Sequence, residues 1–430
     1  MSALRVLLLG GGGREHAMAW KLAQSPRLGA LWTAPGNAGT AQYGPNLPLR
    51  TSDPDAVLAL AEELRAELVI VGPEDPLAAG VADRLAAAGV PVFGPSRAGA
   101  EIEWSKTFAK QLLRDAGIAT ARAQAFDDAP SALEYARALG GACVVKADGL
   151  AAGKGVTVCD DLEQAAAAIE QALVARAFGP AGARVLIEER LYGPETSAHA
   201  FTDGVTVAHM PFSCDHKPAF DGDRGPNTGG MGVYSPPSWL EPATARAIER
   251  DVTERAVAAL RAAGRAYRGV LYPGMMLTAD GPRVIEFNAR FGDPETQALL
   301  PRLRSDLLAI CEAVAAGRLA GVPVEWDDAA TVGVVMAAGG YPGAYASGAP
   351  ITGLDAVDAD VQVFFAGAQR DADGTVRTAG GRVLCVVARG ASVEAARAHA
   401  YDNVRRIHFE GAHFRTDIAA RAAAPVEVRR

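Results

Sequence analysis

Short apolar runs alternate with helical periods along the first hundred residues. Buried strands are predicted at 4–9, 31–34, 68–71 and 90–93, and helices at 14–24, 53–64 (with Ser52 as its cap) and 76–88. Strands alternating with helices are typical of βαβ units on a parallel sheet, whose ligands lie outside the carboxyl ends of the strands. The loops after these strands, at 10–13, 35–39, 72–75 and 94–96, are therefore expected to line one pocket.

The pattern changes from about residue 104. It predicts a helix at 105–116, further strands and helices, including an Ala-rich helix at 161–175, and long polar loops across 213–235. A helix near 242–263 precedes two strands that meet at Gly281, and the last hundred residues read mainly as strands closed by a helix at 393–407. The predicted class is α/β, or α+β for the whole chain, with a parallel N-terminal sheet and a mostly β C-terminal part.

Length and composition limit the classes of protein. A chain of 430 residues exceeds the ~250–300 that one core supports, so several domains are expected. The net charge of −8 disfavours a general grip on nucleic acid, and no apolar run approaches the ~20 residues that span a bilayer. Five scattered cysteines without a CxxC pair fit a reducing cytosol. We expect a cytoplasmic protein without nucleic-acid or membrane partners.

The glycine-rich stretch GGGGREHA at 10–17 follows a strand and opens a helix. Backbone N–H groups at a helix N-terminus bind anions, and glycine permits close approach. The dinucleotide spacing fails because Glu15 takes the place of the last glycine. A phosphate or sugar-phosphate site is favoured over NAD, with a simple tight turn as the alternative.

Lysines mark a second glycine-rich stretch, VVKADGLAAGKGV at 144–156. Only six of the 42 basic residues are Lys, and Lys146 and Lys154 both lie here. A Walker loop would continue with Ser or Thr and a helix, whereas Gly155 and a strand follow Lys154. The stretch predicts a strand–loop–strand lid over phosphates. The later strand end at 187–195 could hold adenine and ribose, but the residues by themselves favour an ordinary charged strand end.

Alternation along RVIEFNARFGDPE at 283–295 predicts a site for a metal and a carboxylate. Ile285 and Phe287 are expected to face the core, while Glu286, Asn288 and Arg290 face a cleft. A carboxylate and an amide oxygen suit Mg²⁺, and a guanidinium can bind a carboxylate through two N–H groups. The loops with Asp215-His216-Lys217 and GPNTGGMG (225–232) could line an anion site or be irregular surface.

Together and in order, these stretches resemble the phosphoribosylamine–glycine ligases (glycinamide ribonucleotide synthetases), a family of ATP-grasp ligases. APGNAGTA, VGPEDPL, SKTFAK, VVMAAGGYPG and GGRVLCV extend the resemblance over essentially the whole chain. It implies a pre-ATP-grasp domain at 1–103, an ATP-grasp domain at 104–320 with a lid subdomain near 120–190, and a C-terminal domain at 329–430.

The resemblance also implies roles for individual residues. Glu286 and Asn288 are expected to bind Mg²⁺ or Mn²⁺, and the expected catalytic residues are Arg290, Lys146 and Asp215. The ATP site would comprise Lys106, Lys146, Gly149, Gly153, Lys154, Gly155, Glu188, Glu189, Leu191 and Glu195. The substrate sites would comprise Gly12, Arg14, Asn37, Thr40, Glu74, Asp215, Lys217, Thr228, Gly229 and Arg290.

The implied reaction joins glycine to 5-phosphoribosylamine at the expense of ATP, through glycyl phosphate and in a monomer, without a covalent enzyme intermediate. Two departures from the family pattern stand out: the first loop lacks the usual Asn among its glycines, and Pro218 follows Asp-His-Lys where a basic residue is usual. The alternatives are another ATP-grasp carboxylate–amine ligase or carboxylase subunit, an NAD-dependent oxidoreductase, and a nucleotide-binding module without activity.

Overall fold

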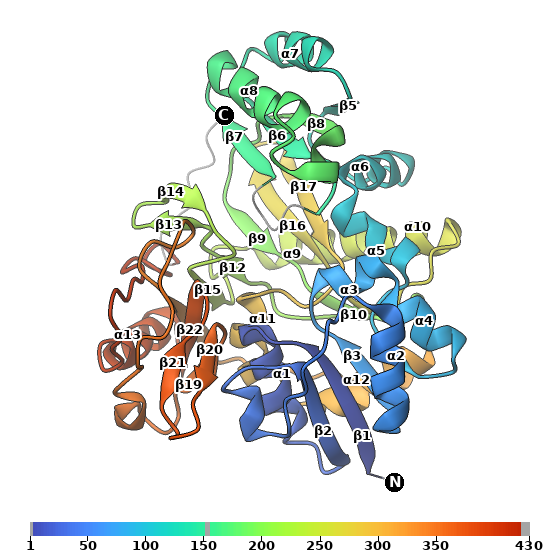
Figure 1. The fold of residues 1–430 in the computed structure, drawn as a ribbon. Coiled ribbons are helices and arrows are strands. Elements are labelled where there is room, and N and C mark those ends of the chain that lie inside the picture. The colour runs from blue at the N-terminus through green and yellow to red at the C-terminus, as the bar shows by residue number, and fades with distance from the viewer. Residues whose placement is uncertain (1–2, 151–154, 423–430) are drawn as a thin grey trace.

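The computed structural model describes residues 3–150 and 155–422. Its N-terminal part is a four-stranded parallel sheet in the order β2-β1-β3-β4 (Figure 1). The strands are β1 (Leu4–Gly10), β2 (Leu28–Pro35), β3 (Leu68–Val71) and β4 (Val92–Phe93), and the helices are α1 (Gly13–Leu22), α2 (Pro54–Glu63), α3 (Glu74–Ala79), α4 (Val81–Ala87) and α5 (Arg97–Trp104). Because all four strands are parallel, their carboxyl-end loops meet at one edge, as the sequence predicts.

Two local predictions in this part are wrong. The cap of α2 is Asp53, whose carboxylate accepts from the backbone N–H of Asp55 and Ala56, so Ser52 is not the cap. The single helix predicted at 76–88 is two helices, α3 and α4, divided at Gly80 with φ of 87°. Glycine adopts this left-handed conformation without the strain that a Cβ brings.

The lid is a small α/β unit at the top of Figure 1. Its antiparallel sheet has the order β5-β8-β6-β7, and it is entered through α6 (Lys106–Asp115), which Ser105 caps. The strands are β5 (Ala123–Phe126), β6 (Cys143–Ala147), β7 (Val156–Cys159) and β8 (Val185–Glu189), and the helices are α7 (Ala129–Ala138) and α8 (Leu162–Ile169), which continues as a π-helix over Glu170–Val174. The lid has a core cluster of its own, with Phe126 and Ile187 among its members.

The central sheet lies below the lid in Figure 1 and is built around one long hairpin, β16 (Gly269–Thr278) and β17 (Gly281–Asn288). The remaining strands are β9 (Glu195–Ser197), β10 (Ala200–Thr202) and β11 (Val207–His209). Helical segments α9 (Pro242–Ile248), a π-helix (Glu249–Glu254), α10 (Arg255–Ala262), α11 (Glu295–Leu299) and α12 (Leu307–Ala316) complete this part.

The C-terminal sheet takes two of its strands from the middle of the chain. Its order is β12-β15-β18-β22-β19, with β12 (Cys214–Asp215), β15 (Gly232–Ser235), β18 (Ala330–Ala337), β19 (Gln362–Phe365) and β22 (Arg382–Gly390). Two hairpins, β13 (Pro218–Phe220) with β14 (Arg224–Asn227) and β20 (Ala368–Arg370) with β21 (Val376–Thr378), and the helix α13 (Val393–Val404) complete it. The prediction of irregular loops across 213–235 is therefore wrong, because β12 to β15 form there.

One hydrophobic cluster joins the parts below the lid. It brings Phe93 of the N-terminal sheet against Phe201 and Phe291 of the central part, and it extends to Phe364 of the C-terminal sheet. The loop ends of the first sheet are thereby fixed beside β17. Across the described ranges, no helix combines the length and apolar character needed to cross a membrane.

Candidate active site

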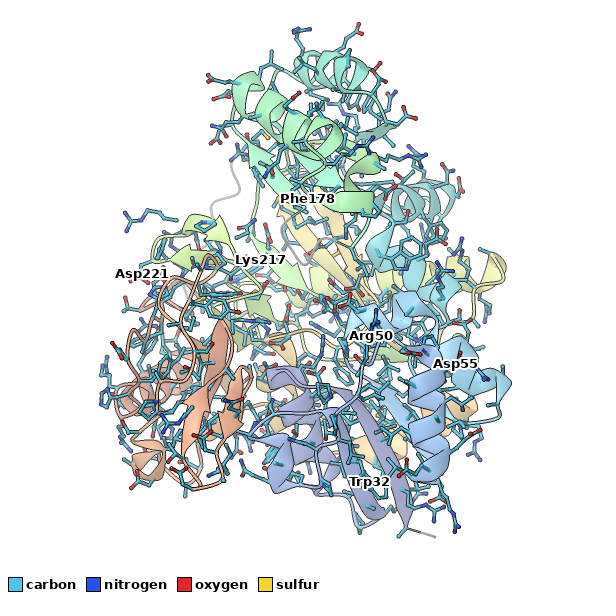
Figure 2. The ribbon with its side chains drawn as sticks, viewed as in Figure 1. Trp32, Arg50, Asp55, Phe178, Lys217 and Asp221 are labelled. Atoms are coloured by element: carbon cyan, nitrogen blue, oxygen red, sulfur yellow. The ribbon has the colours of Figure 1, made fainter. Side chains whose placement is uncertain are left out.

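Two adjoining cavities lie where the lid, the central hairpin and the strands β12 to β15 meet. One of about 380 Å³ has an apolar end lined by Val144, Val158, Leu191, Met276 and Ile285. The other, of about 190 Å³, is highly charged, and the two share Asp215, Lys217 and Glu286. Figure 2 labels Lys217 near the centre of the molecule, between the lid and the C-terminal domain. An apolar recess opening into a charged chamber suits a nucleotide base with its phosphates.

Strand β17 points Glu286 and Asn288 into the charged cavity, as its alternation predicts, and buries Phe287. Ile285 does not face the core: it is only partly buried and lines the apolar recess. The cause is a β-bulge, because Gly274 pairs with Glu286 while the next residue, Met275, pairs with Val284. The extra residue breaks the alternation.

The same bulge positions the lysine at the lid. The Ile285 carbonyl accepts a hydrogen bond of 2.9 Å from Lys146 Nζ, which is also 3.1 Å from Glu188 Oε2. Lys110 reaches the other oxygen of Glu188 at 3.2 Å. Burial lowers the pKa of Lys110 to about 8, although the negative charge of Glu188 acts to raise it. Two lysines on one buried carboxylate leave net positive charge under the lid.

Glu286 and Asn288 are free to take a ligand. Neither side chain has a hydrogen bond or ion pair within residues 3–150 and 155–422. Burial by itself would raise the pKa of Glu286, but Lys106, Lys217 and Lys146 outweigh it and hold the pKa below its usual range. The described residues hold no cluster of three or more His, Cys, Asp or Glu placed for a metal. An ionised carboxylate with an amide oxygen fits Mg²⁺, which takes few protein ligands.

Other predicted ATP-site residues lie around the two cavities. Lys106, Gly149 and Gly155 line the charged one, and Lys106 Nζ donates to the Glu103 carbonyl at 2.7 Å. Glu189, Leu191 and Glu195 line the recess together with Glu188. The Glu188 side chain turns toward Lys110 and Lys146. Gly153 and Lys154 lie outside the described residues.

Asp215 and Lys217 form an ion pair in the wall of the charged cavity. Lys217 Nζ is 3.1 Å from Asp215 Oδ2, and the Lys217 carbonyl accepts from both the N–H and the hydroxyl of Thr228. Gly229 is held from the C-terminal domain, because its carbonyl accepts from Arg382 Nη1 at 2.5 Å. Pro218 begins β13 and its carbonyl accepts from the buried Arg415, so the strand accommodates this departure from the family pattern.

Arg290 is held by carboxylates on both sides. Its Nε lies 3.0 Å from Glu74 Oε2, and its Nη2 lies 3.0 Å from Glu103 Oε1. Nη1 donates to the Tyr272 hydroxyl at 3.2 Å. Burial by itself would raise the pKa of Glu74, but the positive charges of Arg290 and Arg14 lower this pKa to about 2. Arg290 lines the charged cavity, and its position is set before any substrate arrives.

The carboxylate of Glu15 binds the first glycine loop from within the same segment. The Gly12 N–H donates to Glu15 Oε2 at 2.6 Å, and Arg14 Nε donates to Glu15 Oε1 at 2.6 Å. Arg14 is 6% exposed and its Nη1 bonds the Phe291 carbonyl. The residue that broke the dinucleotide spacing therefore acts as an internal anion. Gly12 and Arg14 are placed to shape the loop.

Asn37 and Thr40 shape the neighbouring loop in the same way. The Asn37 amide donates to the carbonyls of Gly11, Gly12 and Phe365, and its oxygen accepts from the Thr40 N–H. The Thr40 hydroxyl bonds within the loop. Asn37 also lines a cavity of about 430 Å³ between this loop and Gly367 to Arg370. The side chains thus tie the first domain to the last.

The chain is similar to known proteins over most of its length. Sequence models of phosphoribosylglycinamide synthetase match as the N domain at 4–103, the ATP-grasp (A) domain at 104–296 and the C domain at 331–421. The chain belongs to the phosphoribosylglycinamide synthetase family. The three matches together cover most of its length.

Curated relatives and solved structures agree with this family. The chain is 48% identical to phosphoribosylamine–glycine ligase of Rhodopirellula baltica and 50% identical to that of Allochromatium vinosum, covering 98% of this chain and 98% and 99% of theirs. The crystal structure of the Thermotoga maritima enzyme has a TM-score of 0.83 at 35% identity and covers 97% and 100%. A Campylobacter jejuni biotin carboxylase, at 15% identity over 96% and 93% with a TM-score of 0.72, shares the fold.

Sequence reasoning missed Lys110, Glu103, Arg382 and Glu295, all of which lie at or next to the site. Lys110 carried a signal, because lysine is rare in this chain and SKTFAK holds two. Of the described lysines, Lys106, Lys110, Lys146 and Lys217 gather here, whereas Lys21 bonds the Leu303 carbonyl elsewhere. Arg382 lies in GGRVLCV, but nothing in that stretch indicates its contact with Gly229, which only the packing of the C-terminal sheet brings about.

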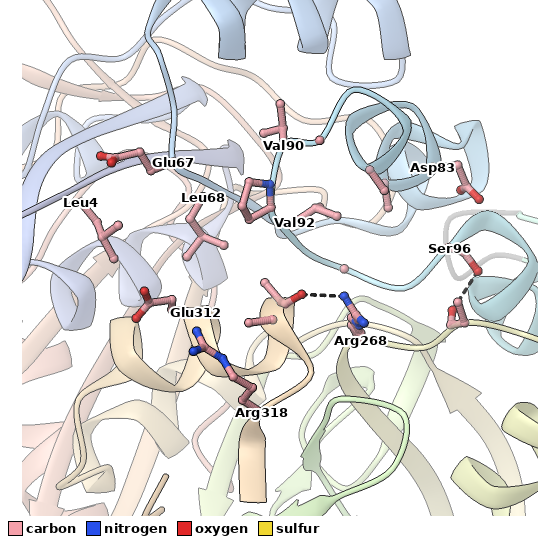
Figure 3. A pocket seen from close by; sticks show the side chains of 18 residues that line it. Leu4, Glu67, Leu68, Asp83, Val90, Val92, Ser96, Arg268, Glu312 and Arg318 are labelled. Atoms are coloured by element: carbon pink, nitrogen blue, oxygen red, sulfur yellow. Dashed lines mark hydrogen bonds between the residues drawn. The ribbon is translucent and has the colours of Figure 1, made fainter. Parts of the chain in front are cut away.

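A larger cavity of about 690 Å³ lies away from the site, between the first sheet and α12 (Figure 3). Of its two arginines, Arg268 donates to the Ala315 carbonyl and so stabilises the fold. The lining mixes Glu67, Asp83, Glu312 and Arg318 with apolar side chains, without convergence on one point. The chemistry of this chain is concentrated at β17.

Proposed function

We propose that this chain is a phosphoribosylamine–glycine ligase, which uses ATP to join glycine to 5-phosphoribosylamine and yields glycinamide ribonucleotide, ADP and phosphate, a step of purine biosynthesis. The observation that carries the proposal is the face of β17, where Glu286 and Asn288 face Lys106 and Lys217 across a charged cavity that opens into an apolar recess. Full-length relatives of this name support the same reaction.

ATP would place its base in the recess and its phosphates beside the lysines. A carboxylate is a poor electrophile, so the γ-phosphoryl group first passes to glycine and gives glycyl phosphate. Lys146 and Lys106 would bear on the phosphate oxygens, and the lid strands would exclude water from the acyl phosphate. Glu286 and Asn288 would hold Mg²⁺ or Mn²⁺, which supplies positive charge to the phosphates when bound.

Glycine would bind between Arg290 and the Asp215–Thr228–Gly229 wall. One N–H of the Arg290 Nη2 group is left for a ligand after its contacts with the described residues. Asp215 offers a carboxylate to an ammonium group. Glu74 and the loops shaped by Gly12, Arg14, Asn37 and Thr40 would receive phosphoribosylamine, whose amine then displaces phosphate from the glycyl group.

We further propose that the enzyme works as a monomer in the cytoplasm. The five cysteines are buried thiols, which suits a reducing compartment. No other ATP-grasp reaction is favoured by an observation of its own.

The test is phosphate release from MgATP, with glycine and with phosphoribosylamine formed in place from ribose 5-phosphate and ammonia. Release should require both co-substrates and fall by about 10²-fold or more in Glu286→Gln, because the metal site loses its charge. Glu163→Gln, an exposed change on α8, is the matched control. No release by the wild-type chain with any combination of substrates would refute the function.

A further inference from the structure

Glu295 is a buried carboxyl group that the mechanism above does not use. It is the first residue of α11, its side chain is 4% exposed, and it lines the charged cavity. Within residues 3–150 and 155–422 its side chain has no hydrogen bond or ion pair with another residue, and only its own backbone N–H contributes a hydrogen bond. A largely buried carboxyl group at the wall of a charged cavity, without a bond to another side chain, is open to a ligand or to a proton.

Four of the other carboxylates of this cavity, Asp215, Asp293, Glu74 and Glu103, already have cationic partners. Asp215 lies 3.1 Å from Lys217, and Asp293 holds the Arg14 N–H, Gln297 and Arg382. Glu74 and Glu103 hold Arg290. Glu286 shares β17 with Asn288 and belongs to the proposed metal site. Among the described carboxyl groups that line this cavity, Glu295 therefore remains available to accept a proton.

Its place in the fold is the junction of the two substrate regions. On one side, Glu295 shares the cavity with Asp215 and Lys217, where glycine is placed. On the other, α11 packs on α1, the helix that the first glycine loop opens, and Asp293 contacts the N–H of Arg14. If the substrates bind as proposed above, an amine held by the N-terminal loops would reach the glycyl carbonyl beside Glu295.

The surroundings tune the acidity of this group. Burial raises the pKa of Glu295 to about 7; Asp215 raises it further, while Lys217 and Arg290 oppose the rise. A general base works best when its pKa lies near the operating pH. Charged or titratable groups face it from each surrounding element: Asp215 of β12, Lys217 after it, Tyr272 of β16, Arg290 after β17, Asp293 before α11 and Arg382 of β22.

We propose that Glu295 is the general base that takes a proton from phosphoribosylamine as its amine attacks glycyl phosphate, an inference that rests on the proposed function. The amine lone pair forms the C–N bond to the glycyl carbonyl carbon. The bond from that carbon to the phosphate oxygen breaks, phosphate leaves with the electron pair, and the amine proton passes to the Glu295 carboxylate. The proton is released to solvent with the products.

The test separates the two halves of the reaction in Glu295→Gln. Hydroxylamine, a strong nucleophile that attacks acyl phosphates without a catalytic base, reports glycyl phosphate as glycine hydroxamate. We expect hydroxamate formation within about 3-fold of the wild type, while glycinamide ribonucleotide formation falls by about 10²- to 10⁴-fold. In the wild type, kcat should rise with pH through about 7 as Glu295 ionises, and this limb should be absent from the residual activity of the variant.

Controls make each outcome decisive. Glu295→Asp keeps a carboxylate and should recover part of the ligation rate, and Glu394→Gln, an exposed change on α13, should leave both assays unchanged. Three results in Glu295→Gln would each overturn the assignment of Glu295 as the general base. They are an equal loss of hydroxamate and product, a raised KM for glycine with kcat unchanged, and full ligation activity. Failure of the wild type to form product would refute the proposed function itself, so the two failures are distinguishable.

Discussion

At the scale of single residues, the site is built from charges fixed before substrate binds. Arg290 is clamped between Glu74 and Glu103, and Glu188 is shared by Lys110 and Lys146. Preorganised charge costs no rearrangement during the reaction, which is why such clamps favour catalysis. These pairs lie in buried surroundings where an unpaired partner would be expensive. The same residues therefore serve stability and chemistry together.

Arg382 gives a test at this scale. Its guanidinium donates to the carbonyls of Gly229 and Asp293 and pairs with the Asp293 carboxylate. Arg382→Leu should lower kcat/KM for glycine about 10- to 100-fold, since losing a charged donor to buried acceptors costs about 1.5–3 kcal/mol. Steady-state kinetics with varied glycine measures this, and Arg389→Leu, an exposed arginine on the same strand, is the control. An unchanged kcat/KM in Arg382→Leu would show that the loop holds without it.

At the scale of elements, local irregularities place the functional groups. The β-bulge in β17 frees the Ile285 carbonyl for Lys146 and leaves Glu286 and Asn288 on the cavity side. A regular strand would have turned Ile285 inward and left the lysine without this acceptor. Helix α11 begins at Glu295, so its first turn presents the proposed base. Bulges often redirect side chains next to active sites.

The start of α2 offers a prediction for a single element. Asp53→Ala should destabilise the protein by about 1 kcal/mol, because the N–H groups of Asp55 and Ala56 lose their acceptor. Ser52→Ala should have little effect, since Ser52 is not the cap. Urea-unfolding midpoints of the two variants, measured side by side, decide between the residues. A larger loss in Ser52→Ala would overturn the assignment of the cap.

At the scale of the whole molecule, the site is a meeting of three parts. The N-terminal domain, the lid and the C-terminal sheet are arranged around the central hairpin (Figure 1), and the first two together with β12 line the cavities beside β17. Two histidines, His16 and His199, are buried in the packed interior. His16 of α1 stacks on Phe365 and accepts from its N–H, and His199 stacks on Tyr272. Burial lowers the pKa of each histidine to about 3.

This burial makes stability depend on pH. Because the folded pKa of His199 lies below the unfolded value of 6.5, the unfolded chain binds the extra proton, and stability falls as pH drops from 6.5 toward 3. His199 should contribute about 1.4 kcal/mol of loss for each pH unit in this window. In His199→Phe this contribution disappears, so the slope of unfolding free energy between pH 6 and 5 should be shallower. His408→Phe, whose ring is exposed, is the control, and equal slopes in all three proteins would contradict the assignment.

The sequence by itself determined the parallel N-terminal sheet, the order of the parts and the placing of Glu286 and Asn288 on one face of a strand. These features depend on local patterns, since strand alternation and glycine-rich turns are written within a few neighbouring residues. Gly12, Arg14, Asn37 and Thr40 were expected in the site from the family resemblance, and the structure uses their polar groups mainly to shape the backbone. A motif indicates that a loop matters without saying which atoms face the ligand.

Tertiary structure alone decided the rest. The bulge at Ile285 follows from pairing with β16. Within 213–235, β12 and β15 form because they pair into a sheet whose other strands lie between residues 330 and 390. Glu188 joins Lys110 and Lys146, and Arg382 reaches Gly229, across long sequence separations. The burial that sets the acidity of Glu295 is likewise a property of the packed molecule. Local patterns fix which way a chain turns, whereas desolvation and charge pairing arise only when distant segments pack together.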